Sequence, residues 1–128
     1  MDIPDILKTY KTVAVVGCSK DETKDSNIIA RFLKGVGYRI IPVNPTAKEM
    51  LGEKCYDSLL RIKEPVEIVD VFRPGSEALD IAKQAVEIGA RVVWLQEGIT
   101  NDEARKYAEE HGLAFVQDKC TMKEYMKL

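Results

Sequence analysis

Short, almost wholly apolar runs alternate along the chain with longer stretches whose apolar residues recur every three or four positions. The short runs have the length and the β-branched content of strands that are buried on both faces of a sheet. They lie at residues 13–16, 40–43, 68–72, 92–95 and 113–116. A sixth, very short edge strand is predicted around residues 54–56. This alternation is typical of a parallel sheet covered by helices on both faces.

The stretches between the strands predict amphipathic helices. The helix after the first strand carries its apolar stripe at Ile29, Phe32, Leu33 and Val36. We expect its start near Asp25 or Ser26, whose side chains can accept hydrogen bonds from free backbone N–H groups. A helix over residues 76–88 presents mainly small residues, and another begins at Thr100 and turns His111 inward. A short opening helix and a C-terminal amphipathic helix complete the prediction.

The predicted fold is one doubly wound Rossmann-like α/β domain over residues 1–128, with a mostly parallel sheet of five to six strands. With the edge strand included, the expected strand order is 3-2-1-4-5-6. A chain of 128 residues has the usual size of one domain, and we find no internal repeat, linker or low-complexity tract. The domain prediction therefore covers the whole chain.

Composition and charge narrow the class of function. The chain has 45% apolar residues, 31% charged residues and a formal net charge of -2. These values are typical of an ordinary globular protein and argue against a nucleic-acid binder or an anionic-membrane binder. No apolar run approaches the roughly 20 residues that span a bilayer, and the first residues lack signal-peptide features. We therefore expect a cytoplasmic protein.

Cysteine and histidine offer little for covalent or metal chemistry. Cys18, Cys55 and Cys120 are odd in number and far apart in sequence, so we expect reduced thiols and no metal site. Cys18 follows Gly17 near a predicted helix N-terminus, which would favour the thiolate form of its side chain. The alternative interpretation is that Cys18 is a small buried residue that fills space. The single histidine, His111, is expected to be structural because it lies in a helix's last turn.

Candidate binding residues follow directly after the predicted strands. In open α/β sheets the ligand binds beyond the carboxyl ends of the strands, where the strand order reverses. The segments after the strands supply Gly17, Cys18, Ser19, Lys20, Lys24, Ser26, Asn44, Pro45, Lys48, Arg73, Gln96, Glu97 and Gly98. The last residues of two strands, Val43 and Phe72, join this set. A glycine turn, a helix N-terminus and four cations suit a phosphate-bearing ligand.

The fingerprint of a nicotinamide dinucleotide site is incomplete. Gly17 is the single glycine of G-x-G-x-x-G that is present, and the second strand ends in Val43-Asn44-Pro45 without the acid that would bind a ribose hydroxyl. The chain also has no G-x-x-x-x-G-K-[ST] loop. An NAD(P)-binding oxidoreductase-like domain is therefore the disfavoured alternative.

One more residue stands out inside a strand. Asp70 lies within the otherwise apolar run at residues 68–72. An ionised carboxylate is costly to bury without partners. We therefore expect Asp70 to make a structural hydrogen bond rather than to act in catalysis.

Five segments together resemble a known family. They read VAVVGCSK, GYRIIPVNP, LGEKCYDSL, VDVFRP and VVWLQEGI, in this order, over about residues 12–120. In this order they resemble the small bacterial and archaeal CoA-binding proteins, whose fold is that of the N-terminal CoA-binding domain of the succinyl-CoA synthetase α subunit. The resemblance implies that coenzyme A, free or as an acyl-CoA, binds across the ends of the strands.

The resemblance also implies roles for particular residues. In the synthetase, the loop after the first strand binds the nucleotide end of CoA, and its counterpart here is residues 17–20. A lysine after the second strand corresponds to Lys48, with one extra residue in this loop. An I-T-E triplet that lines the pantetheine arm corresponds to Leu95, Gln96 and Glu97.

The synthetase carries its phosphorylated histidine in a second domain, and this sequence has no counterpart of that domain. We therefore expect a protein that binds CoA or acyl-CoA without covalent catalysis of its own. The alternative is the CoA-binding subunit of a multi-subunit acyl-CoA synthetase, acting with a synthetase-type partner subunit.

Overall fold

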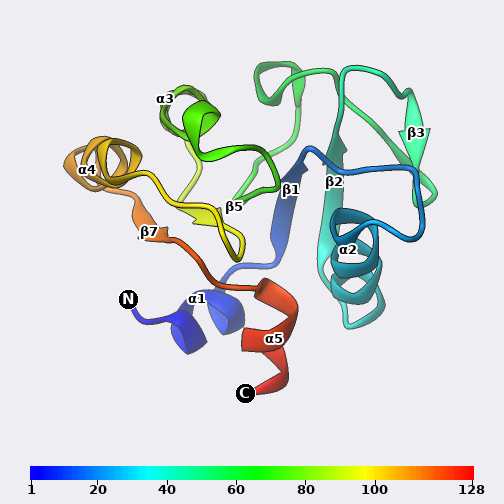
Figure 1. Cartoon of the computed structure of the whole chain (residues 1–128), viewed down its shortest axis with the longest axis horizontal. Coiled ribbons are helices and arrows are strands. Elements are labelled where there is room, and N and C mark those ends of the chain that lie inside the picture. Colours follow the sequence, from blue (N-terminus) through cyan, green and yellow to red (C-terminus); the bar gives the residue numbers. More distant parts are fainter.

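A parallel five-stranded sheet lies between two layers of helices in the computed structural model, which describes residues 1–128 (Figure 1). The strands are β1 (Thr12–Val16), β2 (Arg39–Val43), β5 (Ile68–Val71), β6 (Val92–Leu95) and β7 (Ala114–Val116). Their order is β2-β1-β5-β6-β7, so the direction of winding reverses between β1 and β5. This confirms the predicted Rossmann-like fold, with each strand within one or two residues of its expected bounds.

Helices cover both faces of the sheet. One face is covered by α1 (Ile3–Thr9), α2 (Asp25–Gly35) and α5 (Thr121–Met126), and the other by α3 (Ala78–Glu87) and α4 (Asp102–Glu110). Two short 3-10 helices, η1 (Leu59–Arg61) and η2 (Gly75–Glu77), precede β5 and α3. None of these helices has both the length and the apolar character needed to cross a membrane.

The predicted sixth strand is reduced to a single contact. A parallel bridge joins Tyr56 to Val43 of β2, and the Tyr56 N–H donates to the Pro42 carbonyl at 3.0 Å. The Pro42 carbonyl faces the outer edge of β2, and the Pro42 nitrogen therefore faces the same edge. A proline nitrogen has no hydrogen to donate to a further strand. The sheet therefore has five strands, and the edge position of the 3-2-1-4-5-6 order is not filled by a strand.

The residues before Tyr56 form a separate antiparallel hairpin of β3 (Glu49–Met50) and β4 (Glu53–Lys54). Glu53 pairs with Lys34 of α2 at 3.0 Å and with Arg39 of β2 at 2.6 Å. These ion pairs attach the hairpin to the edge of the sheet and to one covering helix.

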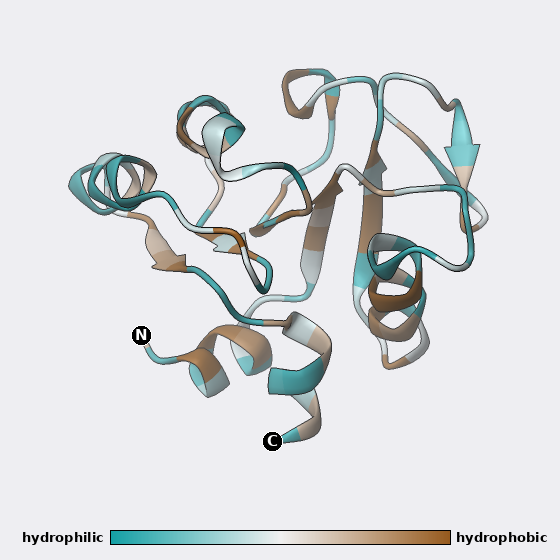
Figure 2. Cartoon of the chain, in the orientation of Figure 1, coloured by the Kyte–Doolittle hydropathy of each residue, from teal (hydrophilic) through white to brown (hydrophobic).

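Apolar residues run through the strands of the sheet (Figure 2), and the cores on its two faces differ in the size of their side chains. The core under α1, α2 and α5 contains large side chains, among them the fully buried Trp94, whose Nε1 donates to the Lys119 carbonyl at 2.8 Å. The other core contains fully buried alanines of the two helices that cover this face, at Ala78, Ala82, Ala85, Ala104 and Ala108. Because these side chains are small, α3 and α4 pack against each other and close to the sheet.

Two helix ends differ from the prediction. Asn101, rather than Thr100, caps α4, because its Oδ1 accepts the Ala104 N–H at 2.9 Å. The helix ends at Glu110, so His111 lies beyond its last turn, exposed and stacked on Tyr107, and the inward prediction for His111 is wrong.

The helix α2 starts at Asp25, as predicted, but its capping differs from the prediction. Lys24 occupies its N-cap position without a side-chain cap, so neither Asp25 nor Ser26 caps this helix. The Ser26 hydroxyl accepts the Ser19 N–H at 2.9 Å instead, because the loop after β1 folds back over the first turn. The predicted capping side chain therefore fixes a loop.

Asp70 is completely buried in β5 and has the structural hydrogen bonds expected from the sequence. Its Oδ1 accepts from Gln96 Nε2 at 2.6 Å, and its Oδ2 accepts from Thr121 Oγ1 at 3.3 Å. Burial raises the pKa of the carboxyl from 3.8 to about 7, although both hydrogen bonds act in the opposite direction. The three side chains join two central strands to the start of α5.

Candidate functional site

A cavity of about 630 Å³ lies at the carboxyl ends of β1, β2 and β5, where the strand order reverses. Five residues predicted from the sequence line it, namely Gly17, Val43, Asn44, Pro45 and Arg73. Other polar lining residues come from the segment before η1, from the end of η2 and from α3, at Asp57, Ser58, Glu77, Asp80 and Gln84. The sequence did not single out this second set, because Asp57 and Ser58 follow no strand of the main sheet and a helical charge pattern does not distinguish a cavity wall from a solvated surface.

Gly17 is required by backbone geometry at the base of this cavity. Its φ is +84°, and a Cβ atom would lie 2.8 Å from Arg73 Cδ and 2.9 Å from the Phe72 carbonyl oxygen. The Gly17 N–H donates to the Val43 carbonyl at 2.9 Å. The absence of a side chain thus lets the ends of three strands approach one another closely.

Asn44 connects the loops that follow β1 and β2. Its Nδ2 donates to the Cys18 carbonyl at 2.9 Å, and its Oδ1 accepts from the Thr46 N–H at 2.8 Å and the Thr46 hydroxyl at 2.7 Å. This is the turn chemistry for which asparagine is suited. The cavity edge at residues 44–46 is therefore held by side-chain hydrogen bonds.

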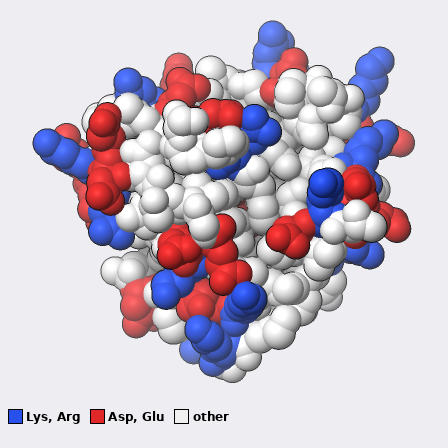
Figure 3. Space-filling model, in the orientation of Figure 1, with Lys and Arg blue, Asp and Glu red and all other residues white.

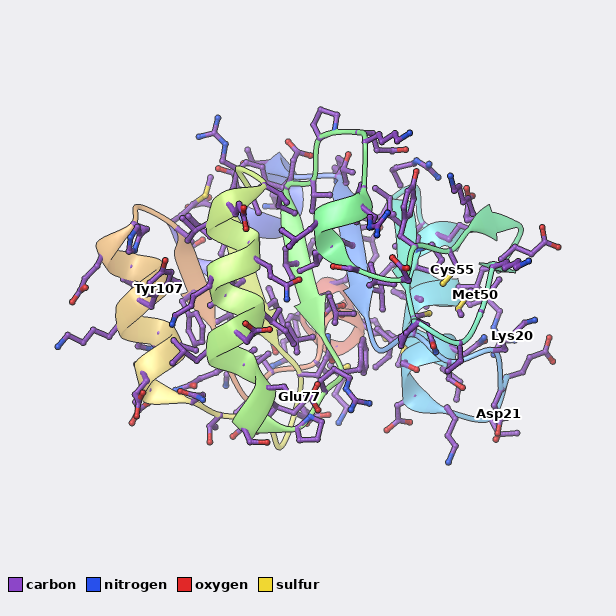
Figure 4. All side chains as sticks on the ribbon, turned by 90° about the horizontal axis from the view of Figure 1, so that it is seen from above. Lys20, Asp21, Met50, Cys55, Glu77 and Tyr107 are labelled. Atoms are coloured by element: carbon purple, nitrogen blue, oxygen red, sulfur yellow. The ribbon has the colours of Figure 1, made fainter.

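The remaining predicted residues of the β1 loop lie on the α2 side. Asn27 Nδ2 donates to the Ser19 carbonyl at 2.8 Å, which adds to the Ser26 contact described above. Lys20 and Lys24 are exposed and line neither large cavity. Figure 4 shows Lys20 well apart from Glu77 at the start of α3. The structure thus does not bring these two lysines together with Arg73.

Cys18 is a buried residue, as one of the two sequence interpretations held. Its side chain has no exposed area, and burial raises the pKa of the thiol to about 12. The interpretation of Cys18 as a thiolate favoured by the nearby helix N-terminus is therefore wrong. Its role in the structure is to fill space beneath the loop after Gly17.

Cys18 is expected to react with iodoacetamide at pH 8 more than about 100-fold slower than a free thiol, since the thiolate is the reacting form. Mass spectrometry of native protein after timed labelling measures this rate. In urea all three cysteines should be labelled at comparable rates. Rapid labelling of Cys18 in the native protein would contradict its assignment as a buried thiol.

Arg73 forms a two-point ion pair with Glu77. Its Nε lies 3.1 Å from Oε1, and its Nη2 lies 2.8 Å from Oε2. The guanidinium lowers the pKa of the Glu77 carboxyl. Both side chains are about half exposed, at 47% and 44%. An anionic ligand in this cavity would therefore compete with a carboxylate for Arg73.

The predicted residues after β6 do not line the cavity. Leu95 and Gln96 are buried, and the Gln96 amide is directed toward Asp70. Glu97 pairs with Lys123 of α5 at 2.8 Å, and the Gly98 N–H donates to Asp118 Oδ1 at 2.7 Å. Phe72 packs against the core that contains Trp94. Residues 95–98 are separate from the group around Gly17, whereas the Phe72 backbone carbonyl lies beside Gly17.

A second cavity of about 560 Å³ adjoins the first and shares Pro45 and Asp57 with it. We call it the basic cavity, because its lining includes Lys48, Lys54, Arg61 and Lys63. Of these four, the sequence analysis selected Lys48 alone, because the others follow no strand of the main sheet. On the face of the molecule that Figure 3 shows, charges of both signs are mixed.

Comparison with known proteins identifies the family of the chain. The sequence pattern of the family described as CoA binding domain matches residues 11–126. The chain belongs to this family. The match covers every strand of the sheet, and it confirms the resemblance drawn from the five sequence segments.

Relatives of this CoA-binding domain include small proteins and large ligases. The uncharacterized protein YneT of Bacillus subtilis is 39% identical over 119 residues, which cover 93% of this chain and 88% of YneT. The ADP-forming acetate–CoA ligase II of Archaeoglobus fulgidus is 31% identical over 111 residues, covering 84% of this chain and 16% of the ligase. A solved structure of a hypothetical protein from Pyrococcus horikoshii OT3 superposes with a TM-score of 0.96 at 42% identity, covering 99% of this chain and 89% of that one.

Proposed function

We propose that this CoA-binding domain binds coenzyme A or an acyl-CoA at the carboxyl ends of β1, β2 and β5. The observation that carries the proposal is the first cavity, which lies at the point where the strand order reverses and adjoins the basic cavity beside β2. Open α/β sheets bind their ligands at this point. CoA is elongated, so it needs a site that extends beyond one cavity.

The residues of the site suit the parts of this ligand. Gly17 lets the ends of three strands approach one another closely at the base of the first cavity, and the loop of Asn44 and Pro45 forms an edge against which a planar base can pack. Carboxylates and amides of α3 offer acceptors and donors for hydroxyl and amide groups. Cations lie in the adjoining basic cavity.

The proposal is tested by the small molecule that the protein retains or binds. We expect mass spectrometry of the denatured, purified protein to detect CoA or an acyl-CoA, and calorimetry to measure binding of added CoA. The same titration with NAD and NADP serves as the control. Binding of NAD or NADP without binding of CoA would favour the oxidoreductase-like alternative and overturn the proposal.

We further propose that the chain alone does not make acyl-CoA. Incubated with acetate, ATP, Mg²⁺ and CoA, it should give no acetyl-CoA above the rate without protein. Activating a carboxylate with ATP requires a metal–nucleotide site and a carrier for the phosphoryl group. The chain has no group of three or more His, Cys, Asp or Glu side chains placed to hold a metal, and His111 is exposed beyond α4.

The similarity to an acetate–CoA ligase supports a second candidate, a CoA-binding subunit that acts with a catalytic partner. Acetyl-CoA measured by chromatography distinguishes the candidates. Formation only after addition of a synthetase-type partner would favour the subunit. Formation by the homogeneous chain, lost on Arg73→Gln, would contradict the binding-only proposal.

A further inference from the structure

The two adjoining cavities differ in charge. The basic cavity has four cations and a single carboxylate, Asp57, in its lining. None of the four cations forms an ion pair. The first cavity has one cation, Arg73, which is paired, against the carboxylates of Asp57, Glu77 and Asp80. A group with high negative charge is therefore attracted to the basic cavity and repelled by the first.

The cations of the basic cavity lie on ordered backbone. Lys54 follows Glu53, whose carboxylate is occupied by Lys34 and Arg39, and the Lys54 ammonium lies 4.9 Å from the centre of the Tyr56 ring. Arg61 is the last residue of η1, and Lys63 follows two positions later. Hydrogen bonds that fix the hairpin and η1 thus place these charges around one cavity.

We propose that the basic cavity binds the 3′-phosphate of CoA, and that Lys54, Arg61 and Lys63 set a preference for CoA over 3′-dephospho-CoA. This inference rests on the proposed function. A phosphate monoester carries a charge near -2 at neutral pH and three acceptor oxygens, whereas each phosphate of a pyrophosphate diester carries about -1. The guanidinium of Arg61 can donate two parallel hydrogen bonds to such a group, and the lysines add point charges.

The shared wall allows one ligand to reach both cavities. Pro45 and Asp57 line each of them, so the cavities meet beside the loop that follows β2. A ligand whose base packs at this loop would direct its 3′-phosphate into the basic cavity and the uncharged pantetheine arm toward α3. This arrangement matches the charges of the 3′-phosphate and of the pantetheine arm to those of their surroundings.

Calorimetry with two ligands and three proteins tests the inference. CoA and 3′-dephospho-CoA are titrated into the unaltered chain, the double variant Arg61→Gln/Lys63→Gln and the control Lys8→Gln/Arg91→Gln. The control removes the same charge at exposed residues that line neither cavity. We expect the double variant to bind CoA about 30-fold more weakly and dephospho-CoA less than about threefold more weakly. The control should change neither affinity.

A measurement on the unaltered chain gives an independent result. If the basic cavity holds the 3′-phosphate, the affinity for CoA should fall more steeply with rising salt concentration than the affinity for dephospho-CoA. The reason is that CoA makes additional charged contacts, which salt screens. Thermal unfolding of each variant should match that of the unaltered chain, since the substituted residues are exposed. Lys54→Gln provides a further variant with the same expected selectivity.

The outcomes separate the two proposals. Equal salt dependence for both ligands, or equal loss of both affinities in the double variant, would overturn the assignment of the 3′-phosphate while leaving CoA binding intact. Absence of binding of either ligand to the unaltered chain would overturn the proposed function itself. A reduced ratio of the two affinities in the Arg61 and Lys63 variant, with an unchanged ratio in the control, supports the inference.

Discussion

Replacing Gly17 with valine is expected to abolish detectable CoA binding and to lower the free energy of unfolding by roughly 3 kcal/mol. The backbone at Gly17 has a φ of +84°, which a β-branched residue strongly disfavours. A Cβ atom would also lie 2.9 Å from the Phe72 carbonyl oxygen, so the ends of β1 and β5 would have to separate. Calorimetry with CoA and urea unfolding measure the two effects.

Gly35→Ala is the matched control for this substitution. A Cβ atom at Gly35 would meet no atom within 4 Å, and the residue lies in the last turn of α2 with a helical backbone. We expect its stability to change by less than about 0.5 kcal/mol and its affinity for CoA to stay the same. If Gly17→Val bound CoA as tightly as the unaltered chain, the cavity beside Gly17 would not be the binding site.

Asp70→Asn is expected to make the protein about 3 to 4 kcal/mol more stable at pH 8 and to remove a decline in stability between about pH 4 and pH 7. Burial raises the pKa of Asp70 from 3.8 to about 7, so the folded chain holds a proton that the unfolded chain has released. The free energy of unfolding therefore falls as pH rises across this interval, and it is constant above the folded pKa. The asparagine amide keeps an acceptor for Gln96 and offers a donor to Thr121.

Urea unfolding at several pH values measures this difference between the two proteins. A carbon-13 NMR titration of the Asp70 carboxyl provides a second readout, with an expected midpoint near pH 7. If the free energy of unfolding depended on pH in the same way for the unaltered chain and the variant, the Asp70 carboxyl would have the same pKa in the folded and unfolded chains. This result would contradict the prediction.

The strands and layers could be predicted because the strands are largely buried on both faces and, apart from Asp70 in β5, read as short apolar runs. The edge strand could not be predicted in the same way, because the pairing of a sixth strand with β2 depends on which side of β2 the Pro42 nitrogen faces. Likewise, Asn101 rather than Thr100 caps α4, and two adjacent residues with suitable side chains are hard to rank from sequence.

The candidate site was predictable where it depends on strand ends. Gly17, Asn44 and Arg73 follow three strands, and the topology brings them to one cavity. Gln96 also follows a strand, but its side chain is directed inward toward Asp70, a partner 26 residues away. Lys54 belongs to a two-residue strand and Arg61 to a three-residue 3-10 helix. Such short elements carry no periodic signal in the sequence, so only the folded chain shows that the two residues meet.

The alanines between α3 and the sheet have a consequence for the entropy of ligand binding. Alanine has no side-chain rotamers to lose, so packing α3 through Ala78, Ala82 and Ala85 incurs almost no side-chain entropy cost on folding. Binding loses affinity when a wall of the site must first be immobilised. The wall that carries Glu77 and Asp80 is preorganised, and an incoming ligand has only the exposed side chains on that wall to order.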